Sequence, residues 1–400
     1  MTDITYSALF EYESPIVVTC APRNATYLLD EINALKMPIK GTELLNVQTF
    51  GTLKDCISLN MHLSTAHRVL FELQAAKAFD LEQVYAVINK IHWEKIIPAD
   101  GYFSIDSVTD STEVRDSRFL NLKIKDAIAD RFINILNRRP DSGPDDSKTV
   151  LFIYWKNHDL KIYLDTSGVS IAKHGYRTSP YKAPLQEALA HCIIKATDWD
   201  MNSTLILPMC GSGTLAIEAA LLAMQKPPGL FSENFAFMHI LGYDNIWWQD
   251  LKKEVLRKIN YKINARIIAS DIDPNAIKYA KINARNAGVN ALIYFQTCDI
   301  ADTQVPASNN GIVIINPPYG ERMGDEDAEL SDLYQKIGNF LKQKCAGYTA
   351  YVFTGNVEMA KKIGLKATRR IEFYNGKIDC RLLKYEMYSG TKRIFENTSE

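Results

Sequence analysis

The sequence predicts an α/β protein whose second half is a doubly wound, largely parallel sheet. From Ala183 onward, short apolar segments alternate with longer segments of helical spacing. The run 312–315, Ile-Val-Ile-Ile, is β-branched throughout, as expected of a strand buried on both faces. Residues suited to ligand binding follow this strand and several others. They therefore predict a site at the carboxyl ends of the strands, where open α/β sheets bind ligands.

The composition indicates a globular chain of two or three domains. Its 400 residues exceed one ordinary domain, and 46% of them are hydrophobic. The net charge of −1 means that a nucleic-acid-binding surface would have to be a local basic patch. No signal peptide or membrane span is expected. The 7 cysteines contain no Cys-x-x-Cys pair, which predicts neither disulfides nor a metal site and favours the cytoplasm.

The N-terminal part also alternates between strands and helices. We expect strands at 15–20, 44–50, 68–73 and 102–108, helices at 25–35, 52–63 and 81–91, and a hairpin from 150–155 and 160–164. A basic helix is expected at 115–139, with one buried stripe formed by residues 119, 120, 124, 127, 128, 132, 135 and 136. Its cationic face is the candidate RNA-facing surface, and a solvated face without a partner is the alternative.

A glycine-rich loop provides the first element of the site. The strand 204–207 runs into Pro208-Met209-Cys210-Gly211-Ser212-Gly213-Thr214, and a helix at 215–224 follows directly. Glycines allow close approach of a ligand, and a helix N-terminus offers free N–H groups. The Gly-x-Gly-x-x-Ala spacing also raises NAD binding. However, the next strand-end acid, Asp271, lies 60 residues beyond Gly211, whereas the NAD fingerprint places an acid about 20 residues on.

Two acidic strand ends follow. Asp271 ends the strand 265–271 and could accept both hydroxyls of a ribose, whereas Asp273 precedes Pro274 and the helix 275–287. One carboxylate is expected to bind the ribose and the other to cap the helix, and Asp271 is favoured for the ribose. After the strand 291–297, Asp299 could accept a hydrogen bond from an adenine amino group, with Ile300 against the ring.

The strand 312–315 ends at Asn316-Pro317-Pro318-Tyr319. The Asn316 amide oxygen and the Pro317 carbonyl can accept hydrogen bonds from an exocyclic amino group, and Tyr319 can stack on a flat base. A strand followed by an ordinary turn is the alternative for these residues alone. The glycine loop and two strand-end acids that precede them favour an acceptor-base site.

Several motifs together give the chain a family resemblance. They are Asp165-Thr166-Ser167-Gly168, Gly175-Tyr176-Arg177, Ala183-Pro184-Leu185, the loop 208–214 and Asn316-Pro317-Pro318-Tyr319-Gly320-Glu321-Arg322. In this order they resemble the THUMP-domain class I RNA methyltransferases, and most closely the bacterial branch that methylates guanine N2 in 23S ribosomal RNA.

The resemblance implies a Rossmann-like methyltransferase domain at 167–400, preceded by a ferredoxin-like element at 1–55 and a THUMP RNA-binding domain at 56–166. It implies S-adenosyl-L-methionine as cofactor and RNA, 23S rRNA or its assembly intermediate, as partner. The implied catalytic residues are Asn316, Pro317, Pro318 and Tyr319. The implied cofactor-binding residues are Pro208, Cys210, Gly211, Ser212, Gly213, Thr214, Asp271, Ile272, Asp299, Ile300 and Asn316.

One departure from the family pattern lies at Leu207, where members usually carry an acid. Glu218 could compensate, although a structural role in its helix is favoured. The segment from about Gln225 to Lys262, with Trp247-Trp248, is an insertion expected to pack its aromatic residues against the sheet, or else to contribute to the RNA face.

Direct transfer of a methyl group to a guanine amino group needs no covalent intermediate. Cytosine C5 methylation would need a cysteine nucleophile, and the motif 312–320 contains none. Four alternatives remain open: a tRNA guanine-N2 enzyme, a DNA adenine-N6 enzyme, a glutamine-modifying protein methyltransferase, and a non-catalytic RNA-binding or ribosome-assembly protein with a weakened cofactor site.

Overall fold

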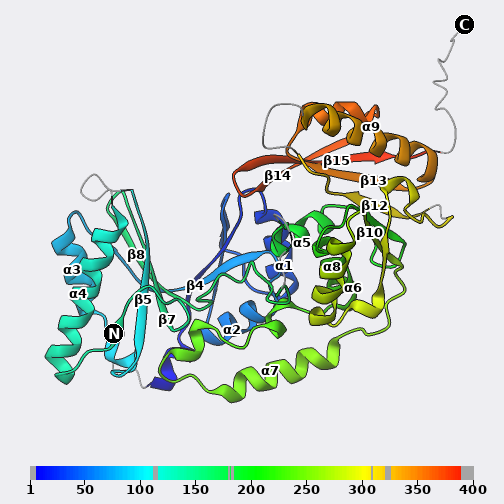
Figure 1. The fold of residues 1–400 in the computed structure, drawn as a ribbon. Helices are drawn as coiled ribbons and strands as arrows, with labels where there is room; N and C mark the ends of the chain where they lie inside the picture. The colour runs from blue at the N-terminus through cyan, green and yellow to red at the C-terminus, as the bar shows by residue number, and fades with distance from the viewer. Residues whose placement is uncertain are drawn as a thin grey trace, which may run out of the picture. The chain divides into compact units, whose positions relative to one another are not determined.

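The computed structural model describes residues 6–110, 116–178, 181, 184–307, 310–319 and 326–388. They form two compact units (Figure 1). The first unit contains the residues up to His174 together with Pro227–Lys258, and the second contains Gly175–Lys226 together with the residues from Ile259 onward. Each unit has its own sheet, and the α/β prediction is confirmed.

The sheet of the first unit has the strand order β2-β3-β1-β4-β8-β7-β5-β6. Its strands are β1 (Ser14–Cys20), β2 (Gly41–Thr42), β3 (Asn46–Gly51), β4 (Ala66–Lys77), β5 (Tyr102–Asp110), β6 (Asp141–Ser142), β7 (Thr149–Lys156) and β8 (Asp159–Asp165). The helices of its first 136 residues are η1 (Tyr6–Glu11), α1 (Ala25–Ala34), α2 (Leu53–His62), α3 (Leu81–Lys90), η2 (Trp93–Lys95) and α4 (Ser117–Leu136). The long strand β4 pairs with β1 through its first half and with β8 through its second, so one sheet runs through the whole unit.

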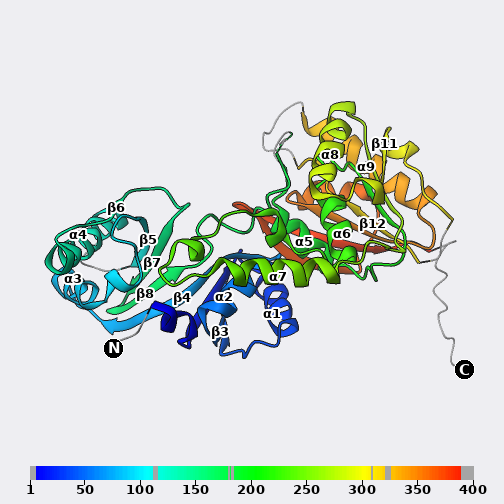
Figure 2. The same ribbon diagram turned by 90° about the horizontal axis from the view of Figure 1, so that it is seen from below.

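Helix α4 lies beside α3 (Figure 2), and its buried stripe is narrower than expected. Leu120, Ile124, Ala127, Ile128, Ala129 and Phe132 are buried, but Phe119, Ile135 and Leu136 are exposed, so the prediction was wrong at these three positions. The reason is length: α4 has 20 residues and α3 has 10, so α3 cannot cover both ends of α4.

The cations of α4 are largely paired with acidic neighbours. Lys123 forms an ion pair with Glu82 at 2.7 Å, and Arg131 contacts Glu94 at 2.7 Å. Arg118 pairs with Asp116, and Arg115 lies outside the described residues. The helix therefore presents less free positive charge than its composition suggested, which weakens it as an RNA-facing surface.

The motif at 165–168 joins β8 to the core of the first unit. The Asp165 carboxylate is fully buried, pairs with Arg68 at 2.5 Å and accepts hydrogen bonds from the Ser167 and Gly168 N–H groups. The Thr166 and Ser167 hydroxyls both contact the Asn60 side chain of α2. These contacts give the motif a structural function in this unit.

Asp165→Ala is expected to destabilise the first unit by about 3–5 kcal/mol, because it leaves the Arg68 guanidinium without its buried partner. Urea unfolding followed by tryptophan fluorescence would measure the loss, since Trp93, Trp155, Trp247 and Trp248 belong to this unit. The matched control is Asp106→Ala, which removes a half-exposed partner of the same Arg68 and should cost no more than about 1 kcal/mol. Equal losses from the two variants would contradict this account.

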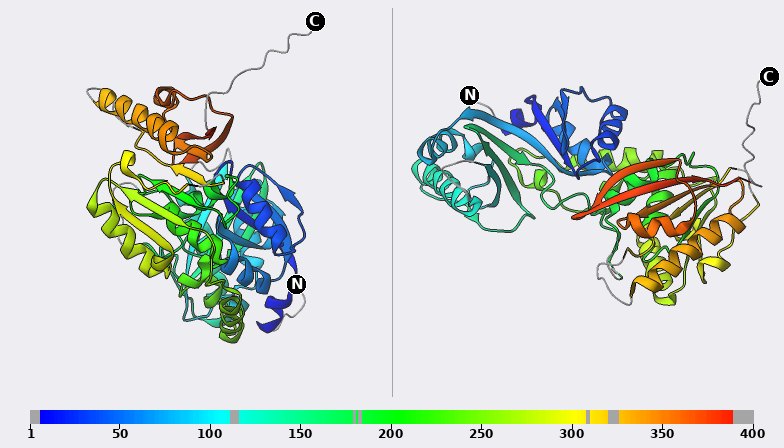
Figure 3. Two further views of the ribbon diagram at one scale, coloured as in Figure 1. Left: turned by 90° about the vertical axis from the view of Figure 1, so that its right-hand side faces the viewer. Right: turned by 90° about the horizontal axis from the view of Figure 1, so that it is seen from above.

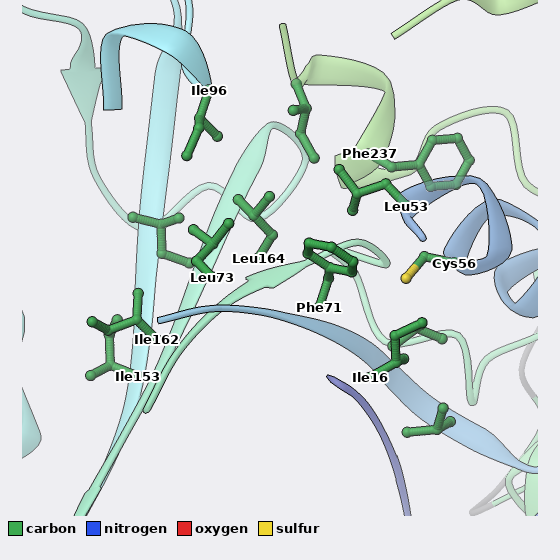
Figure 4. Packing of buried hydrophobic residues seen from close by; sticks show 14 of the residues in the cluster. Ile16, Leu53, Cys56, Phe71, Leu73, Ile96, Ile153, Ile162, Leu164 and Phe237 are labelled. Carbon is green, nitrogen blue, oxygen red and sulfur yellow. The ribbon is translucent and has the colours of Figure 1, made fainter. Parts of the chain in front are cut away.

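The segment 227–258 packs within the first unit, not against the sheet of the second unit as expected from the sequence. It contains η3 (Pro228–Phe231), η4 (Ala236–His239) and α7 (Asn245–Lys258). The Phe237 N–H donates to the Thr166 carbonyl at 3.1 Å, and its ring joins the cluster that includes Leu53, Cys56 and Phe71 (Figure 4). A Cβ at Gly229 would lie 2.5 Å from the Met61 Cα, so this glycine permits the close approach of η3 to α2.

The sheet of the second unit has the order β11-β10-β9-β12-β13-β15-β14. Its strands are β9 (Leu205–Pro208), β10 (Ile267–Asp271), β11 (Ile293–Thr297), β12 (Ile312–Ile315), β13 (Thr349–Thr354), β14 (Arg369–Asn375) and β15 (Ile378–Glu386). Strands β9 to β13 are parallel, and β15 runs antiparallel to both β13 and β14. Figure 3 shows the β14–β15 hairpin in two further views.

Helices cover both faces of this sheet, so the predicted doubly wound arrangement is confirmed. They are α5 (Glu187–Lys195), α6 (Thr214–Met224), α8 (Pro274–Ala287), η5 (Asn290–Leu292), η6 (Ile300–Asp302), α9 (Glu326–Lys344), α10 (Val357–Ala360) and η7 (Lys361–Ile363). Buried residues of α9 share one apolar cluster with Val313, Ile315 and Val352. Helix α5 begins at Glu187, so Pro184 and Leu185 of the family motif precede it, and Ala183 lies outside the described residues.

No helix among the described residues is long and apolar enough to cross a membrane. Those residues also contain no cluster of three or more His, Cys, Asp or Glu side chains placed to hold a metal ion.

Candidate active site

The loops that follow β9, β10, β11 and β12 lie at one edge of the sheet. These four strands are neighbours and run in parallel, so their carboxyl ends meet at the same edge. The predicted strand ends agree with the observed ones to within about one residue, and β9 extends to Pro208. This topology brings the glycine loop, Asp271, Asp299 and Asn316 to one side of the unit.

The glycine loop has open space where a ligand could approach. Gly211 has a φ of +55°, and a Cβ built on it would meet nothing within 4 Å. Gly213 has a φ of +84°, and a Cβ there would lie 2.9 Å from the Ala280 Cβ of α8. Gly213 therefore lets α6 approach α8, whereas the space at Gly211 fits a ligand beside the N-terminus of α6.

The Asp271 carboxylate connects two loops of the edge. One oxygen accepts from the Gly211 N–H at 2.9 Å and the other from the Asp273 N–H at 3.0 Å. Asp273 instead caps α8, because it accepts from the Asn275 N–H at 2.8 Å, and it also binds the Tyr181 hydroxyl. The neighbouring Ile272 is 68% exposed. Asp273 is therefore the residue that caps α8. Asp271 and Ile272 remain as the residues of this strand end that are placed beside the glycine loop.

The Asp299 carboxylate is already engaged in this structure. One oxygen forms an ion pair with Lys336 of α9 at 2.5 Å, and the other accepts from the Ala301 N–H at 2.9 Å. Burial raises the pKa of this carboxyl, but the hydrogen bonds from Lys336 and Ala301 outweigh it and the net shift is downward. Ile300 is only 5% exposed and belongs to the apolar cluster under α9. Asp299 is therefore an ionised acceptor, while Ile300 mainly serves the core.

Leu207 and Glu218 are both buried next to the glycine loop and its helix. Leu207 pairs with Ala269 within the sheet and is 1% exposed. Glu218 accepts from the Tyr176 hydroxyl at 2.8 Å and lies 3.3 Å from His191 Nδ1. Glu218 thus binds side chains from neighbouring segments, and the structural role favoured for it agrees with these contacts.

Arg177 supports the start of α6 in a way that the sequence did not indicate. Its guanidinium pairs with the buried Glu187 at 2.5 Å and donates to the Leu185 carbonyl at 3.0 Å. It also reaches the Thr214 hydroxyl at 3.5 Å, at the first residue of α6. A positioning role for this residue could be found only once the fold had brought these segments together.

The Asn-Pro-Pro-Tyr segment is held at several atoms. The Tyr319 hydroxyl donates to the Asn316 Oδ1 at 2.8 Å, and the Tyr319 ring packs edge-on against Phe353 with centroids 6.2 Å apart. The Asn356 amide donates to the Tyr319 carbonyl at 3.1 Å, and the Tyr334 hydroxyl lies 3.4 Å from the Pro318 carbonyl. Pro317 is buried and Pro318 is exposed, and the continuation Gly320-Glu321-Arg322 lies outside the described residues.

Several of these supporting residues were not predicted. Lys336, Tyr334 and Asn356 each contact a predicted site residue from a distance of 16 to 37 positions along the chain. No local pattern marks them, because a lysine, a tyrosine and an asparagine are ordinary residues in a helix or after a strand.

Cys210 is unsuited to nucleophilic chemistry. Burial and the nearby Asp271 raise the pKa of its thiol well above the usual value. The thiol therefore stays protonated at neutral pH, and only the thiolate is a good nucleophile.

We expect iodoacetamide to leave Cys210 unmodified in the native protein at pH 8 and the activity of the protein to persist. Peptide mass mapping would measure the modification, with urea-denatured protein as the control in which all 7 cysteines react. Alkylation of Cys210 accompanied by loss of activity would instead indicate a reactive thiolate.

Comparison with protein families gives two matches. Residues 174–384 match the model described as the RMKL-like methyltransferase domain, and residues 78–165 match the THUMP domain. A Synechocystis sp. protein provisionally named as an RNA methyltransferase is 32% identical over 96% of this chain and 99% of its own length.

Two further comparisons cover most of the chain. The ribosomal RNA large subunit methyltransferase K/L of Allochromatium vinosum is 34% identical over 93% of this chain, which spans only 52% of that relative. The solved structure of SMU.472, a provisionally assigned methyltransferase in complex with SAH, superposes with a TM-score of 0.84 at 25% identity, covering 95% of this chain and 99% of that one.

Proposed function

This chain belongs to the RMKL-like methyltransferase family, and from that premise we propose that it transfers a methyl group from S-adenosylmethionine to N2 of a guanine in 23S ribosomal RNA. The observation that carries the proposal is the meeting of the glycine loop, Asp271 and Asn316-Pro317-Pro318-Tyr319 at one sheet edge. Such an edge combines a nucleoside-binding loop with acceptors for an amino group.

The residues present suit the cofactor. Asp271 offers a carboxylate for ribose hydroxyls, and Ile272 offers an exposed apolar surface for a base. The open space at Gly211 and the N-terminus of α6 suit the amino-acid end, with Pro208, Cys210, Ser212, Gly213 and Thr214 completing the loop. Asp299 is an acceptor for the adenine amino group, and Ile300 supports its loop from the core. When bound, S-adenosylmethionine supplies an electrophilic methyl group on its sulfonium.

The chain's own contribution to the reaction is to orient the guanine amino group. The N2 lone pair is delocalised into the ring, which makes the nitrogen a poor nucleophile. If the Asn316 Oδ1 and the Pro317 carbonyl accept its two N–H bonds, the nitrogen is held close to the tetrahedral geometry of the transition state. Tyr319 would hold the flipped base by stacking, with Pro318 keeping the segment stiff.

The RNA assignment draws on the first unit and on the relatives. Residues 78–165 match a THUMP model, and the K/L relatives are named for the large ribosomal subunit. This chain spans about half the length of those relatives, so their RNA target is assigned to it here as a proposal. We also propose a cytoplasmic location and, along the sequence, the domain limits 1–55, 56–166 and 167–400, with 227–258 as an insertion that packs in the first unit.

Nucleoside mass spectrometry of separated ribosomal and transfer RNA, from cells with and without the gene, tests the substrate. We expect N2-methylguanosine to fall in 23S rRNA alone. A fall confined to tRNA would support the tRNA alternative, and a change in N6-methyladenosine would point to adenine. No change in any of these nucleosides, together with no calorimetric binding of millimolar S-adenosylmethionine, would contradict the enzyme assignment.

A further inference from the structure

The Tyr319 hydroxyl contacts the atom on which the proposed reaction depends. It donates to the Asn316 Oδ1 at 2.8 Å, and the proposed function assigns that oxygen to an N–H bond of the base. An amide oxygen has two lone pairs, so it can accept from the tyrosine and from the base together. The hydrogen bond is therefore compatible with substrate binding.

An asparagine at this position has two possible orientations with opposite chemistry. One presents an oxygen, which accepts from the guanine amino group, and the other presents an NH2 group, which is itself a donor. A donor facing a donor would leave the amino group without its acceptor. The amide must therefore be held with its oxygen toward the base before the reaction can proceed.

The Tyr319 hydroxyl keeps its proton at neutral pH. Burial raises the pKa of Tyr319 well above its usual value, so the phenol stays a hydrogen-bond donor. The hydroxyl can therefore donate to the Asn316 Oδ1, which lies 2.8 Å away.

The Tyr319 ring is fixed by packing, as a positioning group requires. A Cβ added at Gly355 would lie 3.3 Å from the Tyr319 Cδ2 and 2.5 Å from the Ile378 Cγ2, so little space separates these groups. The edge of Phe353 and the hydrogen bond from Asn356 hold the ring and the carbonyl of the same residue.

We propose that Tyr319 is a positioning residue whose hydroxyl holds the Asn316 amide oxygen toward the amino group of the acceptor base. This inference rests on the proposed function. It gives the tyrosine hydroxyl a role separate from any stacking by its ring. It also predicts that the hydroxyl is dispensable where residue 316 is an aspartate, since both oxygens of a carboxylate are acceptors.

The test is a double-mutant cycle in the full-length protein, with tritiated S-adenosylmethionine and ribosomal RNA purified from cells lacking the gene. Tyr319→Phe keeps the ring and removes one hydrogen bond, so kcat should fall about tenfold, with KM for the RNA and cofactor affinity within a few-fold. In an Asn316→Asp background, the same change should lower kcat by less than about twofold.

One comparison does not depend on activity of the aspartate variant. The matched control is Tyr351→Phe, because Tyr351 lies in the neighbouring strand β13 and its hydroxyl bonds to Asp198. This variant also loses one tyrosine hydroxyl, but it should leave kcat unchanged.

The outcomes separate the two proposals. Wild-type kcat in Tyr319→Phe, or an equal loss of kcat in Tyr351→Phe, would overturn the positioning role while the enzyme assignment stands. An equal loss from Tyr319→Phe in the aspartate background would also overturn it. A wild-type protein that methylates none of this RNA would overturn the proposed function, and the positioning role with it.

Discussion

Asn316→Ala is expected to lower methyl transfer by at least about a hundredfold, because it removes an acceptor that acts as charge develops on the amino group. S-adenosylmethionine affinity should stay within a few-fold, since the glycine loop and Asp271 are untouched. Single-turnover kinetics with saturating RNA, paired with calorimetry of cofactor binding, measure the two quantities separately.

The control for this substitution is Asn286→Ala, which removes another side-chain amide of the same unit. Asn286 lies near the end of α8, away from the sheet edge. Its amide bonds to the Tyr176 carbonyl and the Thr178 hydroxyl. Its activity should match the wild type. If Asn316→Ala lost cofactor affinity and turnover in equal measure, Asn316 would be a structural residue of the loop.

Asp271→Ala should weaken S-adenosylmethionine binding by about a hundredfold or more. The variant removes a charged acceptor for the ribose, and it also releases the Gly211 and Asp273 N–H groups that the carboxylate now holds. Isothermal titration calorimetry would measure the affinity, and circular dichroism would establish that the variant is folded.

Asp273→Ala is the matched comparison two residues away. Because Asp273 caps α8, its loss should cost about 1 kcal/mol of stability while cofactor affinity stays within a few-fold. The reverse result, with the larger loss of affinity in Asp273→Ala, would move the ribose contact to that residue.

The sequence was sufficient for features that are encoded locally. The β-branched run 312–315 and the apolar runs before Asp271 and Asp299 predicted strands with nearly correct ends, of which β11 before Asp299 is a half-buried edge strand. The helix after the glycine loop and the hairpin of β7 and β8 were also predicted, because their signals lie within about a dozen residues.

The remaining features depend on contacts between distant parts of the chain. Lys336 and Asp299 are 37 residues apart, as are Asn356 and Tyr319, and Tyr181 and Asp273 are 92 apart. The ends of α4 are exposed because α3 is the shorter helix. The environment of Trp248 is set by the packing of the segment 227–258 in the first unit. Such information is absent from periodicity and spacing, which describe one element at a time.

The membership of Pro227–Lys258 in the first unit also limits how a gene for this protein can be divided or recombined. The polypeptide passes between the units three times, after His174, Lys226 and Lys258. A fragment beginning at Gly175 would carry Phe237 and Trp248 without the Leu53 and Phe71 side chains that share their cluster. A single crossover therefore cannot exchange either unit intact. A transferable methyltransferase unit would require a short linker between Lys226 and Ile259. The excised segment 227–258 would have to be joined to the fragment that carries the first unit.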